Sequence, residues 1–94
     1  MIRATGGLTQ ESHEVFADAD LYARAVACYD QAVRKERAAH DAIDDYELRY
    51  WYWRQCAARV VTLRALVCRC HLPFDRAVTR ESAEIALRWA EEDD

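Results

Sequence analysis

The strongest constraint on the fold is a run of 65 consecutive residues, 8–72, that contains neither glycine nor proline. Only Gly6, Gly7 and Pro73 interrupt the rest of the chain. Sheet proteins need turns that glycine or proline stabilises about every 8 to 12 residues, so the run argues strongly against a sheet fold. It also excludes the glycine-built loops that bind phosphate. Alanine, the best helix former, supplies 17 of the 94 residues, and the run is expected to be helical.

The helical run must be interrupted, because one continuous helix of this length would extend about 98 Å. Short acidic residues are the candidate interruptions. Asp18 and Asp20 are suited to cap the N-terminus of a following helix. Asp44, with Glu47 three residues later, approximates a capping box at the start of another helix. A last break is expected before Pro73, since proline disfavours helix in the residue that precedes it.

These breaks predict an all-α fold, a compact helical bundle that forms a single domain over 1–94. A chain this short rarely divides into two domains, since domains typically contain about 100 to 200 residues. Residues 1–7 are expected to form a loose tail and 92–94 a frayed acidic end. The helices are expected as a short N-terminal one at about 9–17 and three main ones at about 20–39, 43–70 and 75–91.

Apolar periodicity indicates which side of each helix faces the core. On the long middle helix, Tyr46, Tyr50, Trp53 and Val60 share one side, which we assign to the core. On the last helix, the expected core stripe consists of Val78, Ile85 and Trp89. The middle helix is apolar over much of its circumference, which is typical of a central helix or of one that contributes to an oligomer.

Charge is distributed unevenly along the chain, although the net charge is only −4. Residues 49–80 carry a net charge of +6, whereas 1–48 and 81–94 each carry −5. Such an arginine-rich centre between acidic flanks can neutralise itself within a bundle, or it can bind an acidic partner. The longest segment without Asp, Glu, Lys or Arg is 4–10, too short for a membrane span or a secretion signal. We therefore expect a cytoplasmic protein with no membrane association and reduced cysteines.

The arginines of the middle helix recur at every fifth position, which turns each one 140° from the last. They therefore spiral around the helix, whereas a helix that binds nucleic acid concentrates its cations on one face. The spacing argues against nucleic acid as a partner, and a regulator that binds nucleic acid through this helix is kept as an alternative. The five residues are Arg49, Arg54, Arg59, Arg64 and Arg69.

Arg64 falls on the side of the middle helix that we assign to the core. A buried guanidinium without a partner is very costly, so we expect it to form a structural ion pair. If the second and third helices form an antiparallel hairpin about residues 41–42, position 64 lies opposite Asp18 and Asp20. Glu81 and Glu84 are the other candidate partners.

The densest aromatic cluster of the chain provides the best functional clue. Trp51 and Tyr52 lie away from the assigned core side, beside arginines and a glutamine. Tryptophan, tyrosine and arginine are typical of the residues that dominate protein–protein interfaces. Two interpretations stay open: another helix covers these aromatic side chains, or they contact a partner, which can be a second copy of the chain. The predicted partner-binding residues are Trp51, Tyr52, Arg54, Gln55 and Arg59.

A Cys-x-Cys-His segment has the only spacing in the chain that resembles a metal site. Cys68 and Cys70 point about 200° apart within a helix, so they could chelate a metal together only if the helix unwinds. With His71 and His13 they form a weak candidate set, and buried cysteines acting as small apolar side chains are favoured. We therefore predict no cofactor and no metal, and keep a small thiol or metal sensor as an alternative.

Catalytic signatures are absent from the sequence. Ser12 and Ser82 are the only serines, and neither lies in a strand–turn–helix nucleophile motif. We predict a non-enzymatic module for protein–protein interaction, such as a small adaptor, an inhibitor or a regulatory subunit. It would act by occupying the surface of a larger protein partner. Small acidic helical proteins of this kind are common among phage and mobile-element inhibitors, which is an analogy of size and charge alone.

Overall fold

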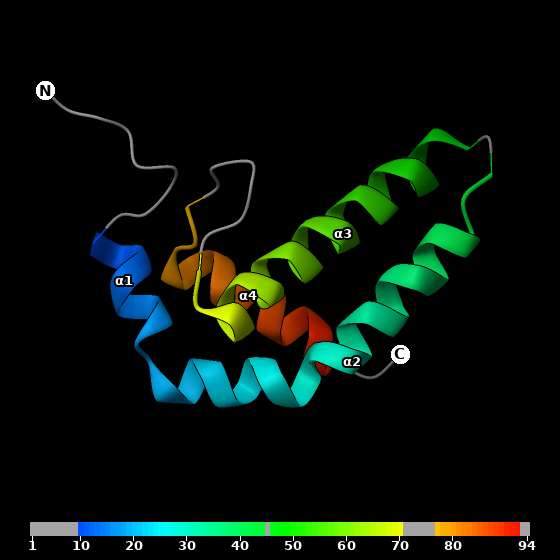
Figure 1. The fold of residues 1–94 in the computed structure, drawn as a ribbon. Coiled ribbons are helices and arrows are strands. Elements are labelled where there is room, and N and C mark those ends of the chain that lie inside the picture. The colour runs from blue at the N-terminus through cyan, green and yellow to red at the C-terminus, as the bar shows by residue number, and fades with distance from the viewer. Residues whose placement is uncertain (1–9, 45, 71–76, 93–94) are drawn as a thin grey trace, which may run out of the picture.

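The computed structural model describes residues 10–44, 46–70 and 77–92, most of which lie in four helices. α2 and α3 form a long antiparallel hairpin, α4 packs against one half of it, and α1 contacts α2 and α4 at that same end (Figure 1). The predicted all-α bundle of three main helices and a short N-terminal one is confirmed. The helices are α1 (Gln10–Phe16), α2 (Ala19–Asp41), α3 (Glu47–Cys68) and α4 (Arg80–Glu91).

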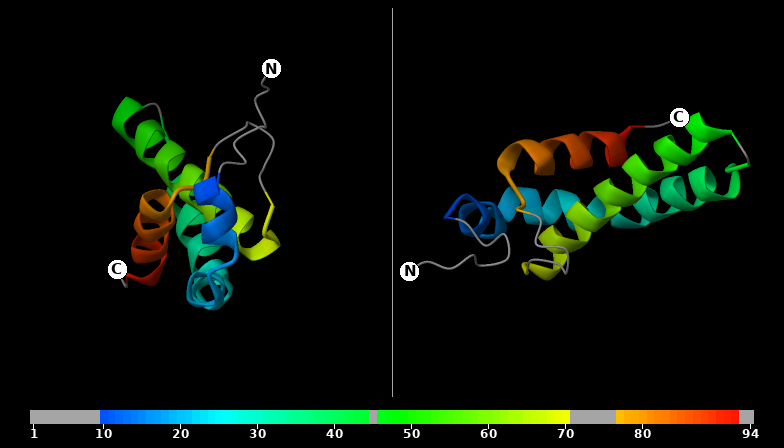
Figure 2. Two further views of the ribbon diagram at one scale, coloured as in Figure 1. Left: turned by 90° about the vertical axis from the view of Figure 1, so that its left-hand side faces the viewer. Right: turned by 90° about the horizontal axis from the view of Figure 1, so that it is seen from above.

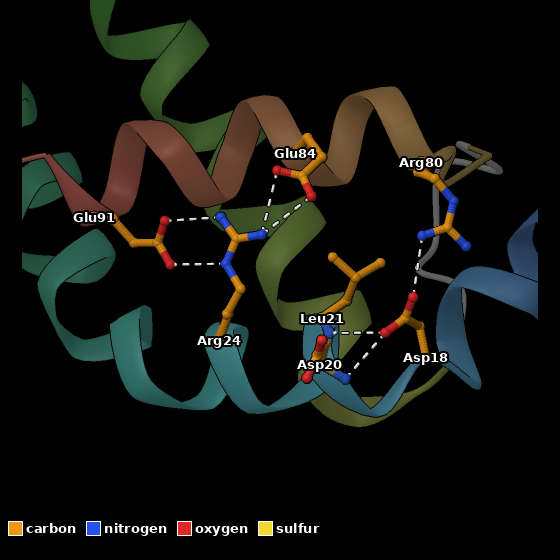
Figure 3. A network of polar contacts seen from close by, with 7 residues as sticks. All are labelled: Asp18, Asp20, Leu21, Arg24, Arg80, Glu84 and Glu91. Atoms are coloured by element: carbon orange, nitrogen blue, oxygen red, sulfur yellow. Dashed lines mark hydrogen bonds and ion pairs between the residues drawn. The ribbon is translucent and has the colours of Figure 1, made fainter.

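Asp18 caps the N-terminus of α2, as predicted. Its Oδ1 accepts hydrogen bonds from the backbone N–H groups of Asp20 and Leu21, at 3.0 and 3.1 Å (Figure 3). These two bonds satisfy donors that a helix N-terminus leaves without an intrahelical partner. Together with the guanidinium of Arg80, 3.1 Å away, they lower the pKa of the Asp18 carboxyl. One side chain thus begins α2 and also ties it to the first residue of α4.

The third helix, predicted at about 43–70, begins four residues later, at Glu47, and ends at Cys68. Asp44 accepts a hydrogen bond from the Tyr46 backbone N–H at 2.8 Å and so organises the preceding turn. The helix N-cap is Tyr46, which makes no side-chain capping bond, so the expected capping box at Asp44 does not form. At the other end, Arg69 terminates α3 in the left-handed conformation, with φ 54°. Its guanidinium lies 4.0 Å from the centre of the Tyr22 ring, a contact that favours this geometry.

The fourth helix begins later than its predicted start at 75. Residues 77–79 are not helical, and Thr79 caps the helix by accepting a hydrogen bond from the Ser82 N–H at 3.0 Å. The Ser82 hydroxyl lies 3.0 Å from the Thr79 N–H, which completes a capping box. Of the predicted acidic end, Glu92 forms the C-cap of α4. The predicted tail at 1–7 and residues 75–76, 93 and 94 lie outside the described residues.

The core lies where α1, α3 and α4 meet the first half of α2. Alanines at the helix contacts, including Ala25, Ala32 and Ala86, are fully buried and allow the helices to approach closely. Leu63 and Leu87 fill the space between them with no exposed surface. The buried apolar residues of α3 are Cys56, Val60, Leu63, Ala65 and Leu66.

Two of the residues that we assigned to the core side of α3, Tyr46 and Tyr50, are exposed. Trp53 is half-buried and packs against the core, and Val60 is buried as predicted. On α4 the buried stripe includes Trp89, while Ile85 is exposed, contrary to expectation. On both α3 and α4, the buried side of the helix is therefore rotated about the helix axis from the predicted side.

Polar contacts between α2 and α4 hold the bundle together along one edge. The Arg24 guanidinium forms two parallel hydrogen bonds with Glu91, at 2.9 and 3.0 Å, and contacts Glu84 at 3.1 Å (Figure 3). Lys35 donates to the backbone carbonyls of Trp89 and Glu92 at the C-terminal end of α4. These carbonyls carry the negative end of the helix dipole, so an ammonium group is a favourable partner.

Candidate protein-binding surface

The hairpin of α2 and α3 is longer than the helix that covers it. α4 contains 12 residues and α3 contains 22, so α3 exceeds it by about 15 Å. The end of α2 and the start of α3 consequently extend beyond α4 (Figures 1 and 2). We call the start of α3, residues 46–55, the distal arm. Its exposed large apolar side chains are Tyr46, Leu48, Tyr50, Trp51 and Tyr52.

The predicted partner-binding residues lie on this arm and just beyond it. The exposed fractions of Trp51 and Tyr52 are 49% and 53%, so neither α1 nor α4 buries them, and the interpretation that a helix covers them is wrong. Arg54 and Gln55 are exposed, and Arg59 is half-buried. The structure thus brings all five together on the accessible side of α3.

The aromatic side chains of the arm are ordered by contacts with one another. The Arg54 guanidinium lies 5.0 Å from the centre of the Trp51 ring and 6.0 Å from that of Tyr50. Tyr50 and Trp51 meet edge to face, with ring centres 6.1 Å apart. Stacked cation and ring contacts restrict the rotamers of these side chains, which lowers the entropy lost when a partner binds.

On the side of the arm that faces α2, Trp53 fixes the hairpin. Its indole N–H donates a hydrogen bond to the Glu36 carboxylate at 2.6 Å, and the His40 ring meets the indole edge to face, at 5.4 Å between centres. Both partners belong to the last turns of α2. The part of α3 that carries the exposed aromatic residues is therefore attached to α2 through Trp53.

A groove between α3 and α4 continues this surface, and of the residues that line it Arg59 was predicted as a binding residue whereas the others were not. Arg59 lies over the Trp89 ring, 5.7 Å from its centre, and Ile85 stands exposed beside it. The spacing of alanines on α4 could have identified Ile85, since Ala83, Ala86 and Ala90 form a buried stripe that leaves position 85 outside. The groove is lined by Arg59, Ile85, Arg88, Trp89 and Glu92.

The predicted ion pair of Arg64 with Asp18 or Asp20 has no counterpart in the contacts that these residues make. Arg64 is exposed, so its expected burial is wrong, and its Nε donates to the Tyr29 hydroxyl at 3.0 Å. Asp18 instead binds Arg80 and caps α2, and Asp20 is exposed in the first turn of that helix. Arg64, which we expected in the core, therefore lies at the surface and is bound by the hydroxyl of Tyr29.

The weak metal candidates do not assemble into a site within the described residues. Cys68, Cys70 and His13 are all exposed, and His71 lies outside the part of the chain that the structure describes. No group of three or more His, Cys, Asp or Glu side chains among the described residues is arranged to hold a metal ion. Cys28 and Cys56 are the buried cysteines, and burial raises the pKa of both thiols.

The five arginines spaced along the middle helix contact different parts of the molecule. Arg49 pairs with Asp44 in the turn, Arg64 with Tyr29 and Arg69 with Tyr22, all on α2 or at its end. The remaining two contact aromatic rings: Arg54 lies over Trp51, and Arg59 lies over Trp89.

Comparison with known proteins identifies no family: no family model matches the chain, and no curated protein or solved structure matches it significantly. The fold and the surface therefore define the molecule as a small all-α bundle with an exposed aromatic and arginine-rich face. None of the described helices is both long enough and apolar enough to span a membrane.

Proposed function

We propose that this protein is a non-enzymatic protein–protein interaction module, an adaptor, inhibitor or regulatory subunit that acts by occupying the surface of a larger partner. The binding residues are Trp51, Tyr52, Arg54, Gln55 and Arg59. The observation that carries the proposal is the exposure of Trp51 and Tyr52 on an arm that neither α1 nor α4 covers.

Two properties of the arm support this function, and the state of the cysteines bears on the compartment in which the protein acts. Large aromatic side chains combined with arginine are the residues most enriched in interface hot spots. The contacts of Arg54 with Trp51 and of Trp53 with Glu36 hold the surface in one arrangement before any partner binds. The four cysteines are unpaired, which suits a reducing compartment, and we propose the cytoplasm as the place of action.

Affinity purification from the native host, with mass spectrometry, tests the proposal when three forms of the chain are compared. The forms are the natural chain, the Trp51→Ala/Tyr52→Ala double variant and a control, Val26→Ala. Val26 is as exposed as Trp51 but lies on α2, outside the surface. Each form is first checked by thermal unfolding, because exposed substitutions should leave stability within about 0.5 kcal/mol per site.

We expect at least one protein to be retained by the natural chain and by the control, and to be lost with the double variant. Retention of the same proteins by all three folded forms would refute the assigned surface. A sharp loss of stability in the double variant, with unchanged binding per folded molecule, would show that these residues support the core instead.

A further inference from the structure

We propose that the partner contributes an amphipathic α-helix whose apolar side chains are flanked by carboxylates, and that this helix lies along the distal arm and into the groove between α3 and α4. This inference rests on the proposed function and specifies the partner's chemistry. Four observations carry it: a continuous stripe, the length of uncovered helix, and two kinds of group that lack a partner among the described residues, namely three arginines without a carboxylate and an indole N–H without an acceptor.

The first observation is that the arm and the groove form one surface. Leu48, Tyr52, Gln55 and Arg59 follow one another at steps of four, three and four residues, so they line one side of α3. Arg59, the last of them, also lines the groove with Ile85. Apolar side chains therefore occur at both ends of the stripe, and polar ones lie between them.

The second observation is the shape of the uncovered region. α3 exceeds α4 by ten residues, about three helical turns. A helix of similar length on the partner could cover this segment through anchors spaced i, i+3, i+4 and i+7, which is the usual mode in which a helix binds a groove.

The third observation concerns charge. Arg24, Arg49 and Arg80 each pair with a carboxylate. In contrast, none of the three arginines of this surface forms an ion pair with a carboxylate among the described residues. They are Arg54, Arg59 and Arg88.

Carboxylates among the described residues also lie at this surface: Glu47 is in the first turn of α3, and Glu92, which follows α4, lines the groove. The three arginines outnumber these two carboxylates, so the surface is cationic, although the whole chain has a net charge of −4. Complementary charge on a partner directs its approach and fixes its orientation.

The fourth observation is the indole N–H of Trp89, which has no hydrogen-bond partner among the described residues. Trp89 is only 7% exposed and lines the groove. A buried donor without an acceptor is destabilising, so an acceptor that reaches it on binding would remove this cost. Because the indole nitrogen itself is buried, a partner oxygen reaches it only if side chains of the groove move on binding, whereas the Arg59 guanidinium is directly available to a carboxylate.

The same charges disfavour a second copy of the chain as the occupant. A symmetric dimer through this surface would bring its three arginines to the interface twice, opposite an identical set. Like charges at an interface are repulsive, and Glu47 and Glu92 together offset only part of the charge of the three arginines.

A displayed peptide library tests the inference with the full chain as bait. The library consists of helix-forming peptides with fixed apolar positions at i, i+3, i+4 and i+7 and random residues on either side of them. We expect the selected peptides to be enriched in Asp and Glu beside the apolar stripe. Their affinity should fall about ten-fold with Arg59→Ala and with Ile85→Glu, and stay unchanged with the controls Arg34→Ala and Val26→Glu on the outer face of α2. It should also fall as salt is raised.

Several results would overturn the inference. These are selection of neutral or basic peptides, equal binding by the Ile85→Glu chain, and the absence of any enrichment over beads without protein. Light scattering that shows a dimer abolished by Ile85→Glu would identify a second copy as the occupant instead. If the chain forms a tight complex with RNA or DNA that is lost when Arg54 and Arg59 are replaced, the occupant of the surface is a nucleic acid and not a peptide.

The partner found by affinity purification separates this inference from the proposed function. If that partner is lost with Trp51→Ala/Tyr52→Ala but binds normally to the Arg59→Ala and Ile85→Glu chains, the proposed function stands without Arg59 as a binding residue, and the groove is not part of the site. If it binds normally to the Trp51 and Tyr52 variant, the proposed function itself fails.

Discussion

Arg24 joins α2 to α4 through two carboxylates, and its replacement by glutamine is expected to weaken the docking of α4. In the natural chain, the guanidinium forms a paired contact with Glu91 at 2.9 and 3.0 Å and a further contact with Glu84 at 3.1 Å (Figure 3). Glutamine keeps part of the aliphatic chain but removes the charge and the planar fork. The substitution therefore tests the ion pairs rather than the packing of the stem.

The expected loss follows from the exposure of the three side chains. They are 35%, 35% and 38% exposed for Arg24, Glu84 and Glu91, so solvent screens both pairs. Exposed pairs contribute about 0.2–1 kcal/mol each, and the two parallel bonds to Glu91 place that pair near the upper end. We expect Arg24→Gln to lower the free energy of unfolding by about 1–2 kcal/mol. For a domain of this size the midpoint of thermal unfolding should fall by about 5–15 °C.

Thermal unfolding followed by circular dichroism at pH 7 and pH 3 measures this effect and its origin. The Arg24 guanidinium lowers the pKa of the Glu91 carboxyl below its ordinary value of 4.5. A carboxyl with a lowered folded-state pKa stabilises the fold above its unfolded-state pKa, and this contribution is lost as the pH falls through the folded-state value. The difference between the natural chain and Arg24→Gln should therefore shrink between pH 7 and pH 3, and also in about 1 M salt.

A matched control is Arg34→Gln, which replaces an exposed arginine whose contact is a 3.5 Å hydrogen bond to Gln31. This variant should unfold within about 0.5 kcal/mol of the natural chain. Equal stability of Arg24→Gln and the natural chain at pH 7 would refute the stabilising role of the two pairs. A stability difference that persists unchanged at pH 3 would show that lost packing, not lost charge, is responsible.

Three further predictions concern the core, the cap of α2 and the thiols. Leu87→Ala should lower the free energy of unfolding by about 2–5 kcal/mol in urea titrations, because the side chain is fully buried, and a smaller loss would contradict the assigned core. Asp18→Ala should lower the midpoint of thermal unfolding at pH 7 more than Asp18→Asn, which keeps the cap, and the difference from the natural chain should decrease in acid because the folded-state pKa of Asp18 is lowered. Cys68 and Cys70 should react with a thiol reagent in the folded protein, and the other two cysteines only after unfolding, so four equally fast thiols would contradict the structure.

The fold class followed from the sequence because its evidence is local. A long run without glycine or proline favours helix, and an aspartate at position 18 can begin a helix through its own side chain, as observed. Asp44 is also an aspartate at a break in the helical run, and the prediction that it caps the next helix is wrong. Its carboxylate bonds to the N–H two residues later and forms a turn, which competes with capping for the same residue type. Spacing alone does not decide between these two uses of an aspartate.

The position of Arg64 could not be predicted, because it depends on where the hairpin turns. A turn centred on residues 41–42 places position 64 opposite 18–20. In the structure α2 continues to Asp41 and α3 begins only at Glu47, so the centre of the turn lies several residues later. The hydrogen bond between Arg64 and Tyr29 reflects this displaced register. Because the turn lies a few residues later than expected, Arg64 contacts the hydroxyl of Tyr29 and not a carboxylate.

The exposure of Trp51 and Tyr52 depends on the relative lengths of helices, which no short motif encodes. Buried leucines and alanines concentrate where α4 and α1 meet the α2–α3 hairpin, and the ion pairs of Arg24 and Arg80 lie at this same end. Beyond α4, α2 is the only described helix that packs against the distal arm, and the arm's exposed aromatic side chains, Trp53 excepted, retain about half of their accessible surface. The apolar area left open on the arm is thus spatially separate from the contacts that stabilise the bundle. Because of this separation, substitutions on the arm can alter binding while the core and the α2–α4 contacts stay intact, so the surface can be tested independently of folding.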